Sequence, residues 1–417
     1  MPNRRNSVYI LLIVSLLAGL LTGRAFFFNL AYLFGELLLV SFIWAWLSVR
    51  WVTISRRTRA RRAQVGRKLD EAFVVRNHSW LPKLWLEVQD HSTFPGHRAS
   101  HIVPALGSRG SHRWYVETLC LVRGEFRLGP LTLVSGDPFG LFVLPRRLEP
   151  TTKVTVYPAT VPVNQFHLPS GILYGGEAQR RRAQYTTTNV SGVRDYVPGD
   201  SFNRIHWQST ARRDRLMVKE FEIDPIADIW LFLDLSPDSL VEDYTVRRTE
   251  ASGTVIPTGP GIPPSTEEYG VVIAASLIQH FIEQERALGF ITYTDKRVVY
   301  QPERGVRHMM RILQVLATAR SISDYSLAQT LALETPYLTR GTTMIIITSS
   351  LDPAWITQAQ LLVNRHVQVM CVLVDPQSFG GITSPETTRT MLRLAKIPTI
   401  TLRKNDDLTA ALAQRPL

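Results

Sequence analysis

Residues 343–348 read TMIIIT, a short apolar and β-branched run in which polar side chains do not alternate with apolar ones. Such a run is typical of a strand that is buried on both faces of a parallel sheet. Segments with helical periodicity separate it from similar runs, and this alternation predicts an α/β domain. The further strands are expected at residues 229–234, 289–293, 367–374 and 398–402, and the helices at 269–288, 306–319, 354–365 and 384–395. We expect the domain to cover residues 228–417, with a flexible Gly/Pro/Thr-rich insertion at 247–265.

Acidic and hydroxyl side chains follow the first of these strands. Ligands of open α/β sheets bind beyond the carboxyl ends of the strands, so these side chains are expected to share one rim. Residues 234–239 read DLSPDS, in which Asp234, Ser236 and Asp238 offer the hard oxygen ligands that Mg²⁺ prefers. An acid at the end of a strand is also a common turn or capping residue. Two interpretations stay open: a divalent ion at the rim, or a degenerate rim that recognises a partner without metal.

The amino-terminal region is apolar and flanked by basic residues. Residues 7–23 read SVYILLIVSLLAGLLTG without a charge, and residues 30–49 are apolar except for Glu36. At 1.5 Å per residue, each segment is close to the length that crosses about 30 Å of hydrocarbon. Arg4 and Arg5 precede the first segment, and eight Lys or Arg residues follow the second between residues 50 and 68. The positive-inside rule therefore predicts a transmembrane helical hairpin with both termini and the soluble domains in the cytoplasm.

Most of the net positive charge of the chain lies in this amino-terminal region. The formal charge is +12, yet residues 1–68 alone contain eleven basic side chains and one acidic side chain. The excess therefore belongs to the membrane-flanking segment, where it is expected to attract anionic lipid, and it does not predict a nucleic-acid-binding surface. Two cysteines are too few for a disulfide scaffold or a cysteine-based metal cluster.

The region between residues 69 and 160 is composed differently. Short apolar or β-branched runs, such as residues 84–88, 114–119 and 154–157, are separated by Gly, Pro, Asn and Asp. This spacing predicts a small antiparallel β-sandwich. The first 68 residues would then form the hairpin and its basic juxtamembrane segment.

A polar segment joins the sandwich to the α/β domain within residues 161–227. Its densest part, residues 192–222, reads GVRDYVPGDSFNRIHWQSTARRDRLMVKEFE. Both signs of charge lie at close spacing, so these residues could form an internal ion-pair network between domains, with Trp207 as a packing anchor. Alternatively, they could grip a partner or an anionic ligand. The residues concerned are Arg194, Asp195, Tyr196, Asp200, Arg204, His206, Trp207, Arg212 and Lys219.

This segment resembles the signature of the domain-of-unknown-function 58 family. The matching runs are RDYVPGD at 194–200, RIHW at 204–207 and LMVKEF at 216–221, with RGEFRLGP at 123–130 and DPFGLF at 137–142 upstream. The resemblance implies a membrane-anchored bacterial or archaeal protein with a von Willebrand factor A-like carboxy-terminal domain. It also implies partnership with MoxR-type AAA+ ATPases and no established enzymatic activity. The adhesion-type metal motif of such domains is incomplete in this chain, because Asp238 replaces a serine and TSS at 348–350 replaces Thr-Asp-Gly.

Together these observations favour a protein-interaction module on the cytoplasmic face of a bacterial inner membrane. It would work with a MoxR-type ATPase in a cell-envelope or complex-assembly role. The alternative is a metal-dependent enzyme that uses the acidic rim, which would need a general base and an open metal position. The chain contains no His-Glu-x-x-His, Gly-x-Ser-x-Gly or Walker A pattern. No catalytic residue is therefore proposed from the sequence.

Overall fold

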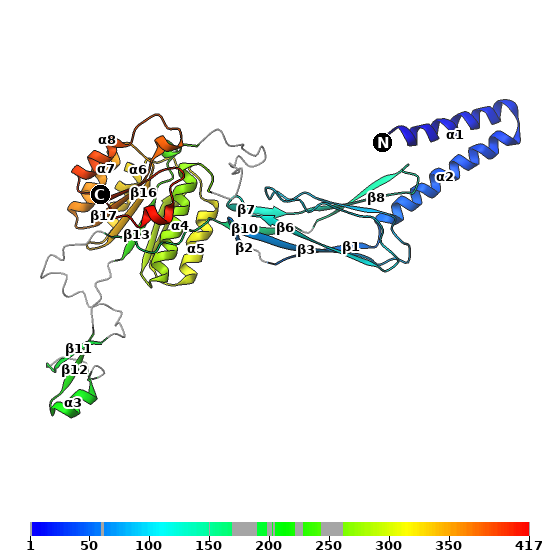
Figure 1. Ribbon diagram of the computed structural model, residues 1–417. Helices are drawn as coiled ribbons and strands as arrows, with labels where there is room; N and C mark the ends of the chain where they lie inside the picture. Colours follow the sequence, from blue (N-terminus) through cyan, green and yellow to red (C-terminus); the bar gives the residue numbers. More distant parts are fainter. Residues whose placement is uncertain are drawn as a thin grey trace.

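The computed structural model describes residues 2–59, 62–149, 151–168, 190–197, 202, 205–221, 228–242 and 262–416. Figure 1 shows a helical hairpin, an elongated β-sandwich and an α/β domain arranged one after another. A small lobe of β11, β12 and α3 stands apart from all three in the same view. The fold is therefore a mixed α+β arrangement in which the sandwich separates the hairpin from the α/β domain.

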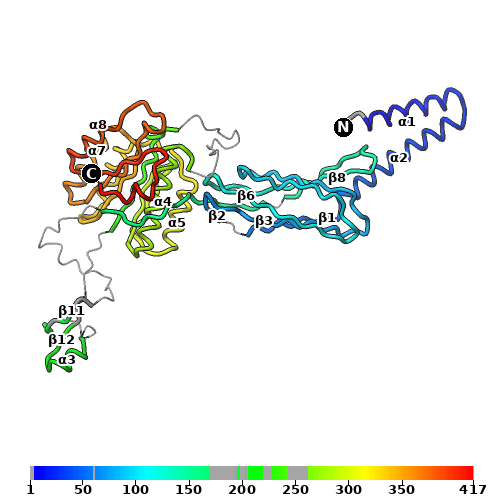
Figure 2. Tube along the Cα trace, in the orientation of Figure 1, coloured from blue at the N-terminus to red at the C-terminus, as the bar shows by residue number. Residues whose placement is uncertain are grey.

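The hairpin consists of α1 (Pro2–Thr22) and α2 (Ala25–Val49). Both helices are long and apolar enough to cross a membrane. The second helix begins five residues earlier than the sequence indicated, so the break between the helices shrinks to Gly23 and Arg24. Gly23 has a φ of +64°, a left-handed conformation that glycine adopts without steric cost, and the chain reverses there (Figure 2).

The sandwich contains three small sheets. Their strand orders are β1-β3-β6, β5-β4-β8-β9 and β2-β10-β7. The strands are β1 (Val52–Thr58), β2 (Arg62–Gln64), β3 (Lys68–Asn77), β4 (Leu86–Asp90), β5 (His101–Val103), β6 (Ser111–Leu119), β7 (Gly124–Leu128), β8 (Leu131–Gly136), β9 (Val143–Leu148) and β10 (Thr152–Tyr157). Buried and less buried residues alternate along β3, which places Phe73 and Val75 in the core with Trp114.

The start of the sandwich corrects the predicted domain boundary. Strand β1 begins at Val52, whereas the sequence indicated a basic juxtamembrane segment as far as residue 68. One of the basic residues assigned to lipid, Arg56, has a side chain that is buried between the sheets. The reason is that Val52, Ile54 and Arg56 alternate on one face of β1, so the strand period continues through the charged residues.

The α/β domain is built on a six-stranded sheet of order β15-β14-β13-β16-β17-β18. Five strands are parallel: β13 (Ile229–Leu233), β14 (Leu288–Tyr293), β16 (Thr343–Thr348), β17 (Gln368–Val374) and β18 (Thr399–Leu402). The edge strand β15 (Arg297–Glu303) runs antiparallel to β14, because only three residues connect the two. The sheet is therefore mixed, which corrects the prediction of a wholly parallel sheet.

Helices cover both faces of this sheet, as the uninterrupted apolar strands require. One core cluster contains side chains of α4 (Thr266–Glu283), α5 (Val306–Thr318) and α9 (Leu408–Leu412). The other contains side chains of α6 (Leu327–Glu334), α7 (Ala354–Asn364) and α8 (Glu386–Leu394). Most of the insertion predicted at 247–265 lies outside the described residues.

The lobe pairs β11 (Val190–Asp195) with β12 (Met217–Phe221) in antiparallel fashion and adds the short helix α3 (Trp207–Arg213). His206 is the N-cap of α3, and its ring accepts a hydrogen bond from the amide of Ser209.

Candidate functional site

Asp234 lies at the carboxyl end of the central strand β13 and is almost fully buried. Its Oδ1 accepts hydrogen bonds from the amide (3.0 Å) and the hydroxyl (2.8 Å) of Ser236. Its Oδ2 accepts one from the hydroxyl of Thr348 at 2.6 Å. Burial raises the pKa of Asp234, although these hydrogen bonds act in the opposite direction. Both oxygens of the carboxylate therefore accept hydrogen bonds from within the protein.

The neighbouring hydroxyl groups are also engaged within the protein. Ser239 Oγ donates to the carbonyl of Ser236 at 2.8 Å, and Ser349 Oγ donates to the carbonyl of Ser239 at 2.5 Å. The cavity beside them has a volume of only about 10 Å³. That is about the space of a single water molecule.

This geometry fits a Mg²⁺ shell poorly. Such a shell is octahedral, with about six oxygen ligands near 2.1 Å. Asp238, the second predicted carboxylate ligand, is exposed on the short 3₁₀ turn η2 (Pro237–Ser239), while Ser236 already donates to Asp234. Within the described part of the chain, no three His, Cys, Asp or Glu side chains form a group that could hold a metal ion. We therefore derive no metal-dependent chemistry from this rim.

We expect Asp234→Ala to destabilise the α/β domain by about 1–3 kcal/mol, because the amide of Ser236 and the hydroxyl of Thr348 lose their buried acceptor. Asp234→Asn should cost less, because its amide oxygen still accepts from Ser236. Urea unfolding of both variants, with and without Mg²⁺, measures this difference. Equal losses in the two variants, or stabilisation by Mg²⁺ only in the unmodified chain, would favour the metal interpretation.

A larger cleft opens beside the carboxyl end of β14. Its volume is about 410 Å³. One wall is the connection from β14 to β15, and the other is the segment around α6 and the 3₁₀ turn η3 (Thr335–Tyr337). The lining residues are Tyr293, Thr294, Asp295, Lys296, Arg297, Asp324, Tyr325, Leu333 and Tyr337. The cleft is thus rich in tyrosine and carries both signs of charge.

Glu334 accepts hydrogen bonds from two of the residues that line the cleft, Arg297 and Tyr293. Its side chain is buried and accepts from Arg297 through both carboxylate oxygens, at 2.5 and 2.9 Å. It also accepts from the hydroxyl of Tyr293 at 2.5 Å. Burial and the bond to Glu334 raise the pKa of Tyr293 to about 12, so this phenol stays protonated at neutral pH. The guanidinium of Arg297 lies 5.5 Å from the ring centroid of Tyr337, in cation–π range.

The upper part of the cleft is open to solvent. Tyr337 is 71% exposed, and Tyr325 and Leu333 are each about half exposed. Tyrosine and arginine are enriched among the residues that dominate protein–protein binding energies, since each offers a large contact area with a polar end. Glu334 therefore holds Tyr293 and Arg297 in place by hydrogen bonds, and the exposed Tyr325, Leu333 and Tyr337 can contact a partner.

The sandwich reaches the α/β domain through Arg123, which is 1% exposed. Its guanidinium donates to Glu267 at 2.5 Å and to Glu268 at 2.9 Å, both in the first turn of α4. It also donates to the carbonyls of Leu316 and Ala319 at the end of α5. One side chain of the sandwich therefore satisfies carbonyls at one helix end and pairs with acids at the start of another.

This interdomain contact adjoins the rim. Arg320 lies 3.3 Å from Glu267 and from Glu268, which completes a cluster with two positive and two negative groups. The second oxygen of Glu267 accepts from the amide of Ser321, and both residues line the small cavity beside Asp234. The loop that begins at Ser321 continues into the cleft, so the sandwich contacts the base of a cleft wall.

The signature segment occupies a different position from the one expected of an interdomain network. Trp207, predicted as a packing anchor, is 67% exposed, and Arg212 is exposed on the same helix. Asp195 pairs with Arg215 at 3.2 Å on the surface of the lobe. Tyr196 and His206 are partly buried. Asp200 and Arg204 lie outside the described residues, as do the side chains of Arg194 and Lys219.

The interdomain contact was missed by the sequence reasoning. Its signal was the run RGEFRLGP at 123–130, whose first residue is Arg123, together with adjacent acids at the start of a helix. The cleft was missed because Glu334 and Arg297 belong to elements, α6 and β15, that the sequence did not indicate. A partner-binding role for the signature segment stays a prediction.

Comparison with known proteins agrees with the sequence signature. The family model described as "Protein of unknown function DUF58" matches residues 192–257. The uncharacterized protein YeaD of Bacillus subtilis (strain 168) is 21% identical over 327 residues, which cover 74% of each chain.

Two solved structures that resemble the chain each match only a part of it. The CARDB domain of the PF1109 protein from Pyrococcus furiosus is 14% identical, with a TM-score of 0.20, over 25% of this chain and 91% of that domain. The pilus adhesin SpaC of Lactobacillus rhamnosus GG is 10% identical, with a TM-score of 0.31, over 45% of this chain and 28% of the adhesin. Scores of this size do not define the fold further.

The family match and the YeaD relationship both extend the signature that the sequence itself carries. The two apolar amino-terminal helices also agree with the membrane anchoring that this resemblance implied. Residues 192–257 therefore carry the DUF58 signature, and the similarity to YeaD supports the same family.

Proposed function

We propose that this protein is a membrane-anchored protein-interaction module whose tyrosine-rich cleft binds a partner protein. The observation that carries the proposal is the cleft of about 410 Å³, in which the buried Glu334 pairs with Arg297 beside the exposed Tyr325 and Tyr337. Tyrosine and arginine are the residue types that are enriched in binding hot spots.

The cellular arrangement follows from the flanking charges and the helices. In this proposal α1 and α2 cross the inner membrane, and the basic residues at both ends keep the sandwich and the α/β domain in the cytoplasm. The sandwich then holds the cleft away from the membrane surface (Figure 1).

The partner class follows from the family resemblance. We propose a MoxR-type AAA+ ATPase, which would supply the nucleotide hydrolysis for which this sequence has no Walker A pattern. The strand order β15-β14-β13-β16-β17-β18, with one antiparallel edge, supports a von Willebrand factor A type of domain. The cleft lies beyond the carboxyl ends of its strands, where α/β domains bind their ligands.

Combined Tyr325→Ala and Tyr337→Ala substitutions should weaken binding of a MoxR-type ATPase from the same organism. Each truncation of a hot-spot tyrosine is expected to cost about 1–2 kcal/mol, so the double variant should lose roughly 30-fold or more in Kd. Titration of the full chain in detergent or nanodiscs against the purified ATPase measures this change.

The matched control is Tyr115→Ala, which removes a tyrosine that is 70% exposed on the sandwich strand β6. It should leave the affinity unchanged. Equal losses in the control, or undiminished binding by the double variant, would contradict the cleft as the binding site. Absence of any ATPase binding by the unmodified chain would contradict the choice of partner.

A further inference from the structure

The carboxyl end of α2 is built into the sandwich. Its last turns bury Ala45, Ser48 and Val49, and β8 and β9 pack against them. Lys83, itself buried, donates from Nζ to the carbonyl of Leu47 at 2.7 Å. Arg146 donates to the carbonyl of Val49 at 3.1 Å. Two sandwich side chains thus bind carbonyls in the last turn of the helix, which fixes this end of the sandwich against the membrane helix.

The loop 137–143 projects from this end, between β8 and β9. Its shape is set by Asp137, which is 2% exposed and accepts from the amides of Phe139 (2.9 Å) and Phe142 (2.6 Å). Gly140 makes the turn possible with a φ of +71°. The polar atoms of Asp137 are used inside the loop, so its surface is formed by the apolar residues of the sequence DPFGLFV.

The contacts of Phe142 locate the loop relative to the membrane helices. Its ring centroid lies 5.6 Å from that of Phe42 in α2. The guanidinium of Arg5, which precedes the uncharged run of α1, lies 5.9 Å from the same ring. A charged residue at the start of an apolar span lies near the boundary of the hydrocarbon. The loop is therefore level with the lipid interface.

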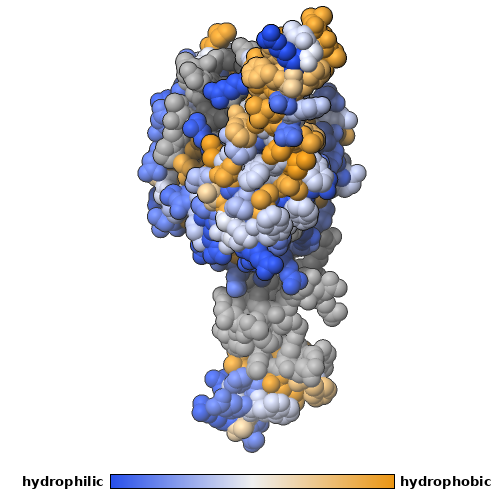
Figure 3. Space-filling view, turned by 90° about the vertical axis from the view of Figure 1, so that its right-hand side faces the viewer, coloured by the Kyte–Doolittle hydropathy of each residue, from blue (hydrophilic) through white to orange (hydrophobic). Residues whose placement is uncertain are grey.

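Further apolar side chains surround this loop at the same end of the sandwich. Phe139 is 56% exposed and Val143 52% exposed. The loop 79–84 lies close by, because the amide of His78 donates to the carbonyl of Trp51 just after α2, and it presents Trp80 at 78% exposure. Figure 3, which looks from the side that carries the hairpin, shows hydrophobic residues gathered on that side of the molecule. Exposed aromatic residues beside a membrane span match the aromatic belt of membrane proteins.

We propose that loop 137–143, with loop 79–84 beside it, inserts its apolar side chains into the lipid interface next to α2. The inference rests on the proposal that α1 and α2 cross a membrane. Lipid is the occupant that the geometry favours, because Phe42 and its neighbour Ile43 are themselves exposed on α2 and continue into the loop as one apolar surface. The sandwich would then be held to the membrane at a second place, and its orientation to the bilayer would be fixed.

The test is depth-dependent quenching of a fluorophore by lipid. The full chain carries an NBD label on a single new cysteine, Phe139→Cys, and is placed in nanodiscs with one chain per disc. The discs contain phosphatidylcholine and phosphatidylglycerol, with or without doxyl-labelled lipid. Both native cysteines are buried, and burial raises the pKa of the Cys120 thiol to about 11, so the label goes to the introduced site. Val143→Cys provides a second position in the same loop.

Two reference positions distinguish the possible results. Ile43→Cys reports on α2 itself, and Tyr115→Cys reports on an exposed sandwich site remote from the loop. We expect doxyl lipid to quench the labels at positions 43, 139 and 143 but not the label at 115.

Quenching at 43 alone would overturn the inserted loop while leaving the membrane anchor intact. Absence of quenching at all four positions would overturn both proposals. Equal quenching at 115 and 139 would mean that the sandwich lies flat on the membrane, which also contradicts an inserted tip. Because each disc holds one chain, contact with a second copy cannot imitate the effect.

Discussion

Replacing Arg123 by alanine should release the sandwich from the α/β domain. The substitution leaves Glu267 and Glu268 without their closest cation, and it removes the guanidinium hydrogen bonds to the carbonyls of Leu316 and Ala319. Breaking a buried ion pair by removing one partner typically costs about 3–5 kcal/mol, and here, among the described residues, Arg320 would be the one cation left facing two acids. We expect the loss of this much interdomain free energy to let the two domains separate and unfold independently.

Limited proteolysis and differential scanning calorimetry of the full chain in detergent measure this separation. In the unmodified chain the two domains should unfold together. In Arg123→Ala, proteolysis should cleave residues 151–168 faster, and the first calorimetric transition should occur at a lower temperature. Arg127→Ala is the matched control, because Arg127 lies on β7, the strand that directly follows Arg123, and has an exposed side chain. Arg123→Lys should restore only part of the contact, because one ammonium group cannot reproduce the forked contacts to both acids and both carbonyls. Unchanged cleavage and unfolding in Arg123→Ala would show that the interface does not depend on this residue.

The sequence predicted the elements whose signal is local. The apolar helices and the strands of the α/β domain are continuous apolar runs, and burial on both faces requires that pattern wherever the chain lies. Asp234 was placed at the rim for the same reason, because a residue that follows a buried strand must emerge at the edge of the sheet. Its chemistry was less predictable, since Thr348, which donates to it, comes from another strand.

Interactions between distant residues gave no comparable signal. Arg123 is separated from its acidic partners by 144 and 145 residues, so the run RGEFRLGP marks the residue but does not indicate which groups it contacts. Strand β1 was hidden because its inward-facing Arg56 interrupts an otherwise apolar alternation. In both cases an arginine is buried beside acidic side chains from other elements. Only the tertiary structure brings such partners together, so the local sequence does not predict the pairing.

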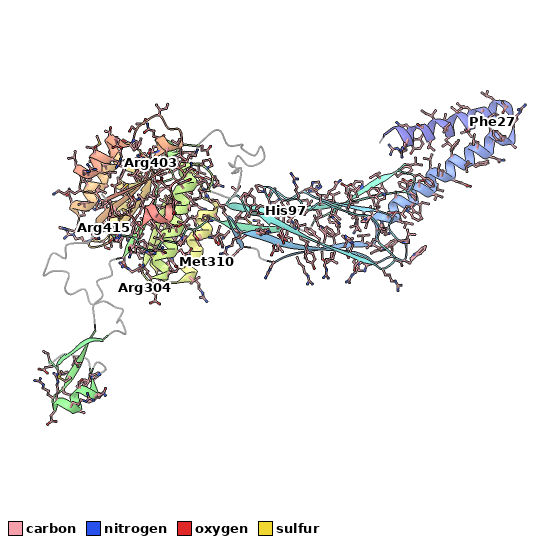
Figure 4. The ribbon with its side chains drawn as sticks, in the orientation of Figure 1. Phe27, His97, Arg304, Met310, Arg403 and Arg415 are labelled. Atoms are coloured by element: carbon pink, nitrogen blue, oxygen red, sulfur yellow. The ribbon has the colours of Figure 1, made fainter. Side chains whose placement is uncertain are left out.

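Arg56→Ala should lower the free energy of unfolding of the sandwich by about as much as Arg123→Ala weakens the interdomain contact. The guanidinium of Arg56 contacts both oxygens of Glu71 at 2.8 Å and lies 3.4 Å from Asp90. Asp90 also lies 2.9 Å from Nε2 of His97, whose Nδ1 contacts the hydroxyl of Thr118 at 2.7 Å. His97 is labelled inside the sandwich in Figure 4.

The charged side chains of this cluster are all less than 10% exposed, so the loss of Arg56 leaves two buried carboxylates with one ionisable partner. We expect a cost of about 3–5 kcal/mol at neutral pH. Arg57→Ala, which removes the next, exposed arginine of β1, should have little effect. Hydrogen exchange of the β3 amides measures both variants without interference from the α/β domain.

The pH dependence provides the decisive comparison. Burial alone would raise the pKa of Asp90, but hydrogen bonds from His97 and Ser92 and the charge of Arg56 hold it below its ordinary value. A carboxyl whose pKa is lower in the folded state stabilises the fold above its unfolded pKa of about 4, and this contribution disappears as the pH falls through the folded value. The unmodified sandwich should therefore lose protection on acidification below about pH 4. Arg56→Ala removes one cause of the low pKa, so it should start less stable at pH 7 and lose less on acidification. Parallel losses in the two proteins would show that Arg56 does not hold Asp90 in its charged form.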